Sequence, residues 1–330
     1  MKKLFLSVLL YTAFLFLVAV PSEATKFKRT GTTGFAFLEI PGTARQAALG
    51  DAYSAIGGST DASGIFVNPA SLGYVTKPTF TITYGTWLVN TSHQTVGFAY
   101  SMGSAGVLGI SAIRFDAGDM AETVADATVL AGFRETGTMF NMGALAIGPT
   151  YSLRMTDRFA FGVTIRYARE GVSNITSAQG SDFSATNFLA EVGTLYYTGF
   201  GSLRFSTNIQ SIGFDTKYIA DPFQSPVVYR IGAGYDFFDK PDSPAKLTTV
   251  IEAIHPTDSP EKVMAGAELW ILDKIALRGG YKFSYDEEGF TGGVGLKIDV
   301  GGGRPIGLDF AYVDYGRLKS VTRFTLNFEM

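Results

Sequence analysis

The chain has 330 residues, of which 39 are glycine, 14% are aromatic and only 17% are charged. Ordinary soluble domains carry roughly 25% charged residues. The net charge of −3 argues against a nucleic-acid partner, which requires a basic face. With no cysteine in the chain, disulfides, thiolate metal sites and a cysteine-anchored lipoprotein are excluded.

The N-terminus has the three parts of an export signal. Lys2 and Lys3 form a basic region, Leu4 to Val20 an apolar region, and Ser22-Glu23-Ala24 a small-x-small cleavage site. We therefore predict a signal peptide over residues 1–24 and a mature chain that begins at Thr25, with a net charge of −4 once two lysines and one glutamate are removed. An uncleaved transmembrane helix is the alternative, because the apolar region is near the lower limit of about 17 residues for spanning a bilayer.

No other segment contains about 18 consecutive apolar residues, so we expect no further transmembrane helix. A mature chain in a bilayer would therefore have to cross it as a closed barrel, the other structure that satisfies its own backbone groups.

Residues 25–78 are rich in alanine and glycine. They predict a short helix around Thr43 to Ser54 and a turn at Asn68-Pro69-Ala70. This segment is too small to form a domain of its own, so we expect it to fold into the mouth of the barrel as a plug or hatch.

From residue 79 to residue 330, apolar and polar residues alternate with a period of two, which is typical of strands with two different faces. In the last strand one face carries Phe324, Leu326, Phe328 and Met330, and the other carries Arg323, Thr325, Asn327 and Glu329. The polar faces contain many small residues and single charges, whereas a soluble sandwich would favour long, flexible lysine and glutamate there. This composition favours a confined barrel lumen.

The turn signals predict about fourteen antiparallel strands, an even number as bacterial barrels require. The predicted strands are 79–90, 93–102, 105–116, 140–155, 158–170, 186–198, 200–210, 226–238, 246–255, 261–271, 274–285, 289–300, 304–314 and 321–330. Short connections alternate with long ones, apart from the short connection at residues 91–92. The long connections 117–139, 171–185 and 211–225 are predicted outer loops.

Arg45 lies in a stretch of small and apolar residues, so its charge requires an acidic partner. The candidates are Glu191, Glu252, Glu268 and Asp309. A salt bridge between hatch and wall is the structural interpretation of Arg45, and a substrate contact is the functional one.

A row of basic residues is predicted to face the barrel interior. Its members are Arg154, Arg166, Arg204, Arg278, Lys282, Lys297 and Arg323. Acidic residues are interspersed with them, which favours internal ion pairs over an anion-selective pore.

The outer loop 117–139 contains the apolar run 127–133, where contact with water is expected. Val129, Leu130 and Phe133 are candidates for a docking patch that binds a hydrophobic ligand or a secreted protein. The alternative is that the loop packs over the barrel mouth.

We expect no catalytic, cofactor-binding or metal-binding residues. His93 and His255 are the only histidines, and neither belongs to a metal-ligand pattern. The glycine-rich segments 57–60 and 292–295 do not fit a phosphate loop, because the first lacks the lysine and the second lies within an alternating strand.

The segment Phe37 to Ala52, followed by Asp61-Ala62 and by Asn68 to Leu72, resembles the N-terminal signature of the PorV/PorQ family. That family is related to the FadL long-chain fatty acid transporters. The resemblance covers about 36 residues and implies a fourteen-stranded outer-membrane barrel with a hatch that carries an Asn-Pro-Ala motif. The hatch residues singled out in this way are Arg45, Gly50, Asp51, Asn68, Pro69 and Ala70.

The resemblance implies two roles for a barrel in the bacterial outer membrane. PorV-like proteins serve type IX secretion and receive secreted proteins or secretion-system components. FadL-like proteins pass hydrophobic molecules through the barrel wall, which implies a hydrophobic ligand or a detergent-like molecule inside the barrel. A structural barrel whose loops contact other envelope components is a third hypothesis. Outer-membrane lipid is a partner in each case.

Overall fold

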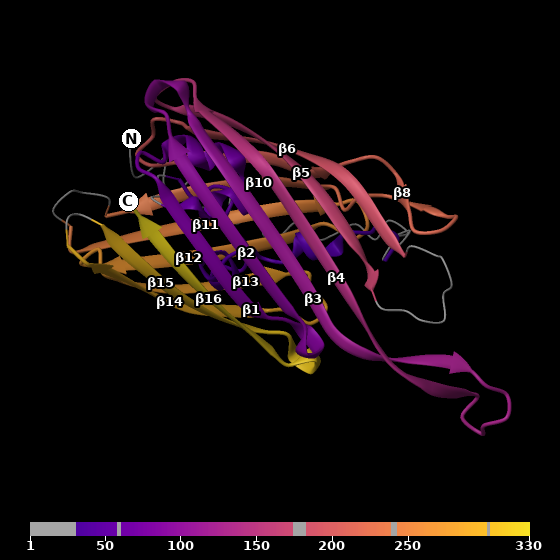
Figure 1. The fold of residues 1–330 in the computed structure, drawn as a ribbon. Helices are drawn as coiled ribbons and strands as arrows, with labels where there is room; N and C mark the ends of the chain where they lie inside the picture. The colour runs from indigo at the N-terminus through magenta and orange to yellow at the C-terminus, as the bar shows by residue number, and fades with distance from the viewer. Residues whose placement is uncertain (1–30, 58–60, 174–182, 239–242, 302–303) are drawn as a thin grey trace.

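The computed structural model describes residues 31–57, 61–173, 183–238, 243–301 and 304–330. Fourteen antiparallel strands close into one barrel, in the order β1-β16-β15-β14-β13-β12-β11-β10-β7-β6-β5-β4-β3-β2 (Figure 1). The predicted strand number and fold class are therefore confirmed. The expected signal peptide lies outside the described residues, and among the described residues no helix is long and apolar enough to span a bilayer.

The strands agree closely with the alternating segments of the sequence. The barrel strands are β1 (Thr79–Thr86), β2 (Ser92–Ser101), β3 (Val107–Ala125), β4 (Phe133–Arg154), β5 (Phe159–Ser173), β6 (Ser184–Tyr197), β7 (Arg204–Ile212), β10 (Val228–Phe237), β11 (Ala245–Pro256), β12 (Lys262–Ile271), β13 (Ile275–Phe283), β14 (Phe290–Asp299), β15 (Pro305–Asp314) and β16 (Ser320–Glu329). Short helical elements occur at η1 (Ala36–Glu39), α2 (Ala44–Ala48), η2 (Ala62–Phe66), η3 (Pro69–Tyr74), η4 (Leu88–Asn90), η5 (Gly103–Ala105) and η6 (Gly316–Leu318).

The first and last strands complete the barrel. β1 pairs with β16 in the register Ile82↔Leu326, which leaves neither strand as a free edge. The two faces of β16 differ as the alternation predicts: Phe324 is 57% exposed on the outside, whereas its neighbour Arg323 is 1% exposed on the inside. An apolar outer face and a closed ladder are what a bilayer requires of a β-protein.

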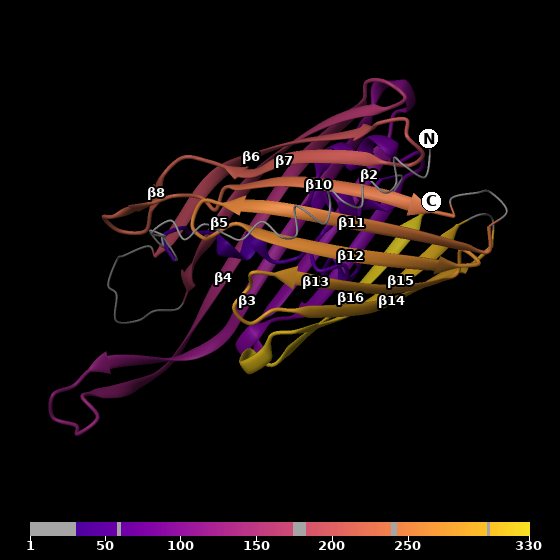
Figure 2. The same ribbon diagram turned by 180° about the vertical axis from the view of Figure 1, so that it is seen from behind.

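The two ends of the barrel differ in their connections. Strands β2, β4, β6, β10, β12 and β14 all run toward the end of the barrel that holds the C-terminus (Figures 1 and 2). We call this end the inner end, because bacterial barrels place their short turns on the periplasmic side. The opposite end is the outer end.

The predicted outer loop 117–139 is wrong for most of its length. β3 continues to Ala125 and β4 begins at Phe133, so the two strands form a hairpin that projects beyond the outer end (Figure 1). We call residues 117–139 the outer arm. A register shift between Asp116 and Asp119, with Gly118 at φ 75°, marks the place where the arm leaves the barrel.

The predicted loop 211–225 also contains regular structure. Its strands β8 (Thr216–Lys217) and β9 (Pro222–Phe223) form a small separate ribbon near the outer end.

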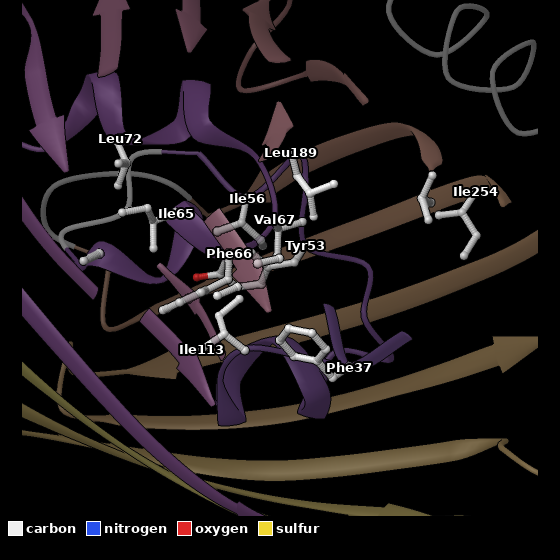
Figure 3. Packing of buried hydrophobic residues seen from close by; sticks show 14 of the residues in the cluster. Phe37, Tyr53, Ile56, Ile65, Phe66, Val67, Leu72, Ile113, Leu189 and Ile254 are labelled. Carbon is white, nitrogen blue, oxygen red and sulfur yellow. The ribbon is translucent and has the colours of Figure 1, made fainter. Parts of the chain in front are cut away.

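The hatch occupies the lumen. Its apolar side chains, among them Phe37, Ile65 and Leu72, are buried against wall residues such as Ile113 and Leu189 (Figure 3). The helix expected over residues 43–54 is much shorter: Thr43 caps α2, which ends at Ala48. The chain then turns because Gly50 and Asp51 both adopt positive φ, which a continuing α-helix does not allow.

Hatch backbone lies directly on inward-facing glycines of the wall. A Cβ atom at Gly162 of β5 would lie 2.4 Å from the carbonyl carbon of Pro69, and one at Gly280 of β13 would lie 2.3 Å from the amide nitrogen of Gly50. Wall and hatch therefore approach each other as closely as glycine permits.

Replacement of Gly162 by alanine should destabilise the docked hatch by about 1–3 kcal/mol, the usual effect of overpacking. The control is Gly143→Ala on β4, because a Cβ atom there meets nothing closer than 3.7 Å. In lipid vesicles, Gly162→Ala should unfold at a lower urea concentration than Gly143→Ala, and protease should cleave its hatch faster. Equal unfolding midpoints would contradict the close contact.

Candidate functional site

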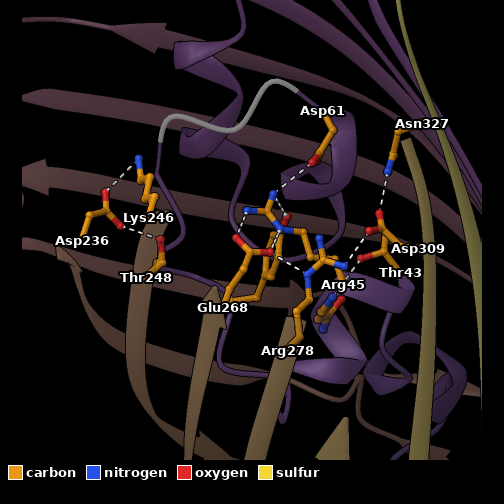
Figure 4. Close-up of polar contacts among 12 residues, drawn as sticks. Thr43, Arg45, Asp61, Asp236, Lys246, Thr248, Glu268, Arg278, Asp309 and Asn327 are labelled. Carbon is orange, nitrogen blue, oxygen red and sulfur yellow. Dashed lines mark hydrogen bonds and ion pairs between the residues drawn. The ribbon is translucent and has the colours of Figure 1, made fainter. Parts of the chain in front are cut away.

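Arg45 joins the hatch to the wall (Figure 4). Its Nε and Nη2 atoms donate to the two carboxylate oxygens of Glu268 on β12 at 2.8 and 2.6 Å, and its Nη1 donates to Asp61 at 3.0 Å. Glu268 is one of the four partners considered from the sequence. The pair is bidentate, and the Glu268 side chain is only 1% exposed.

The Arg45 pair is part of a larger network. Glu268 also accepts from Arg278 at 2.6 Å, Arg278 donates to Asp309 at 2.6 Å, and Asn327 donates to the other oxygen of Asp309 at 2.9 Å. The network therefore connects α2 with β12, β13, β15 and β16. Burial alone would lower the pKa of Arg45, but the attraction of Glu268 and Asp61 raises it above its ordinary value, so the guanidinium stays charged.

Most of the predicted interior basic residues have acidic partners. The pairs are Arg166–Glu191, Arg204–Asp236, Arg278–Glu268, Lys282–Asp51 and Lys297–Asp273. Sequence reasoning missed a further pair, Arg230–Glu252, at 2.8 Å.

The two remaining members of the basic row, Arg323 and Arg154, pack against aromatic rings. Arg323 lies over the Trp87 ring, 5.4 Å from its centroid, and its Nη1 is 3.1 Å from the Nδ1 atom of His93. Arg154 lies 5.8 Å from the centroid of Tyr74. Most of the row is therefore ion-paired, which favours internal salt bridges over an anion-selective pore.

Asn68, Pro69 and Ala70 form the turn that begins η3. The Asn68 side-chain oxygen accepts from Ala70 N at 3.1 Å, and its amide donates to the carbonyl oxygens of Ser54 and Thr194 at 2.9 and 3.1 Å. Asn68 thereby caps η3 and connects it to the hatch segment around Ser54 and to strand β6. The motif has a structural role that its residue types explain.

Two cavities lie on opposite sides of the hatch. The inner cavity has a volume of about 330 Å³ and is lined by Arg45, Glu268 and other members of the ion-pair network. The outer cavity, of about 400 Å³, is lined by Phe37, Trp87, Tyr285 and other residues near the outer end. The two cavities have no lining residue in common.

The wall shows no lateral gap between its described strands. Every neighbouring pair in the barrel is bonded along an antiparallel ladder. The irregularities are local: a bulge between β6 and β7, where Ser211 has φ 57°, and an interruption of the β4–β5 register around Pro149. A proline cannot donate to the ladder, which explains the second irregularity.

The candidate docking patch lies at the tip of the outer arm. Leu130 is fully exposed, and Val129 and Phe133 are 42% and 52% exposed. The arm projects away from the barrel mouth (Figure 2), so it does not form the cover that was the alternative interpretation.

The two histidines lie apart. His93 is buried at the start of β2 beside Arg323, whereas His255 is exposed and 3.2 Å from Glu261. Within the part of the chain that the structure describes, no three histidine or acidic side chains are grouped as a metal site would require.

A closed, apolar-faced barrel of fourteen strands with its lumen filled by an N-terminal hatch defines an outer-membrane protein. The chain belongs to the family described as "Type IX secretion system protein PorV", whose model matches residues 23–258. No curated protein matches the sequence.

Several solved structures share the fold. The Ralstonia pickettii toluene transporter TbuX is similar with a TM-score of 0.55 and 13% identity, over 88% of this chain and 97% of that one. A Pseudomonas aeruginosa FadL homologue gives a TM-score of 0.55 and 9% identity, over 87% and 97%. The CymD monoaromatic hydrocarbon channel gives 0.58 and 10%, over 88% and 96%. At these identities the likeness shows the fold.

Replacement of Arg45 by methionine should lower the free energy of unfolding by about 3 kcal/mol, because a buried carboxylate loses one of its two cationic partners. Combining Arg45→Met with Glu268→Gln should recover part of that loss. Lys297→Met, in an exposed pair with Asp273, is the control and should cost less than about 1 kcal/mol. The measurement is urea unfolding followed by tryptophan fluorescence, and a loss for Arg45→Met no larger than the control's would refute the anchoring role.

Proposed function

We propose that this outer-membrane barrel is an accessory of protein secretion that engages secreted proteins or secretion-system components at the cell surface. The observation that carries the proposal is the outer arm, a hairpin that projects from the outer end and presents Val129, Leu130 and Phe133 at its tip. Exposed apolar side chains of this kind are typical of protein interaction sites.

Two further observations support this role. The hatch occupies the lumen, and its contacts with the wall are ion pairs, close backbone packing and buried apolar side chains. The family model that matches the chain is one of type IX secretion. Both favour a function carried by the outer surface of the protein.

The second candidate function is transport of hydrophobic compounds, and the outer cavity favours it. Apolar and aromatic side chains such as Phe37, Phe115 and Met264 line this cavity together with charged ones such as Arg230 and Lys282. Its apolar part could hold a hydrophobic ligand or a detergent-like molecule. The structural neighbours include a toluene transporter and a monoaromatic hydrocarbon channel. Transport would require a path past the hatch, because the outer cavity and the inner cavity share no lining residue.

We also propose that the chain reaches the outer membrane after cleavage near Ala24. The small-x-small site at residues 22–24 supports this. Mass determination of the N-terminus of the purified protein tests it.

Replacement of Val129, Leu130 and Phe133 together by serine should reduce the amount of secreted protein by about tenfold, since buried apolar anchors dominate protein interfaces. The measurement is quantitative proteomics of the culture medium. Val89→Ser is the control, because Val89 is 85% exposed in the β1–β2 connection at the same end but outside the arm.

A shift in gel mobility between unheated and heated samples should show that both variants retain the folded barrel. If deletion of the whole protein left the secreted proteome unchanged, the secretion role would have to be abandoned.

A further inference from the structure

The outer arm has a free edge along β3. β2 pairs with β3 as far as Ser92↔Asp116, but β3 continues to Ala125. Residues 119–121 and 123–125 pair with β4 on one side, and among the described residues no strand pairs with residues 117–125 on the other side. The connection between β1 and β2, residues 87–91, is too short to cover this edge.

The register shows which backbone groups of the edge point outward. Asp126 donates its amide to the carbonyl of Gly132 at 3.0 Å, and the strands continue as Ala125↔Phe133, Val124↔Arg134 and Thr123↔Glu135. Because bonded and non-bonded pairs alternate in an antiparallel ladder, Thr123 and Ala125 direct their N–H and C=O groups away from β4. Both residues are exposed.

The edge has part of the protection that natural proteins give to exposed strands, because it carries Asp119 and Glu122 and two register shifts. Lysine, proline and very short length are the other common protections. Residues 117–125 contain neither lysine nor proline, and residues 123–125 pair with β4 without a register shift. An edge of this kind is a template for an added strand.

We propose that the β3 edge of the outer arm binds an extended, basic segment of a partner protein as an additional strand. This inference rests on the proposed secretion function and specifies the chemistry of the partner. Backbone hydrogen bonds would supply affinity, and the apolar arm tip would bind an adjoining surface.

The charge of the arm indicates a basic partner segment. Residues 117–139 contain Asp119, Glu122, Asp126 and Glu135 but only one basic residue, Arg134. Arg134 pairs with Asp126, and Glu122 is buried. Asp119 and Glu135 are therefore the acidic residues that a partner strand would meet. A second copy of the arm would bring a second surface of the same negative charge beside it, and like charges are unfavourable across paired strands. Lysine or arginine on the added strand would be attracted instead.

The test uses the full chain in lipid nanodiscs and a disulfide-closed hairpin peptide whose strands alternate valine and lysine. A closed hairpin loses little conformational entropy on binding. Hydrogen–deuterium exchange should slow at Thr123 and Ala125 when the peptide is added. A peptide with glutamate in place of lysine should bind at least about tenfold more weakly.

Proline substitutions separate strand addition from other modes of binding. Thr123→Pro removes an outward N–H without breaking a bond to β4, so it should weaken peptide binding about tenfold, whereas Thr123→Ala should not. Glu135→Pro removes an outward N–H from the opposite edge and should bind like Glu135→Gln. Equal binding by the two Thr123 variants, or unchanged exchange at residues 119–125, would overturn the inference.

Three further outcomes are decisive. Concentration-dependent protection of residues 119–125 without peptide would show that a second copy is the occupant, and the proposed partner would be wrong. If the peptide fails to bind while the arm-tip variant still impairs secretion, strand addition fails and the secretion role stands. If the peptide binds but deletion of the protein leaves secretion unchanged, the secretion role fails.

Discussion

The contact between hatch and wall determines what the rest of this barrel can do. Inward glycines such as Gly162 and Gly280 let hatch backbone lie against the strands, and Arg45 adds a buried bidentate pair with Glu268. An unpaired charge in this setting would be strongly destabilising, so each partner constrains the other. The lumen is consequently part of the folded core, as the burial of Ile65 and Leu72 also shows.

Because the hatch occupies the lumen, the outer end is the part of the barrel that carries the proposed function. The same fold is found in proteins described as hydrocarbon channels and transporters, but a shared fold does not fix function. In this chain the wall is paired throughout the described strands, whereas the outer arm is a long exposed hairpin with an apolar tip and a free edge. The proposed binding role of the arm rests on these two features.

The sequence predicts the barrel well because each spanning strand is buried differently on its two faces. The strand predicted at 321–330 is found at Ser320–Glu329. The arm was not predicted, since its strands are exposed on both sides and carry little alternation. Register shifts near Gly118 and around Ala121 further disturb the pattern. The helix at 43–54 was overestimated because composition does not reveal the positive φ of Gly50 and Asp51.

The partners of charged residues were harder to predict than the strands. Four acids were equally suitable for Arg45, because the choice depends on which wall strand faces α2. Arg230–Glu252 was missed for a related reason. The two residues sit on neighbouring strands, where Arg230 lies opposite Ile254 and Glu252 opposite Gly232, so their contact follows only once the register is known.

Permeability of the purified, full-length protein in planar bilayers and liposomes tests the central claim most directly. A barrel whose lumen is closed by an ion-paired hatch should show no steady single-channel conductance and no uptake of an aromatic hydrocarbon above protein-free liposomes. Sustained conductance or saturable hydrocarbon uptake would contradict this account.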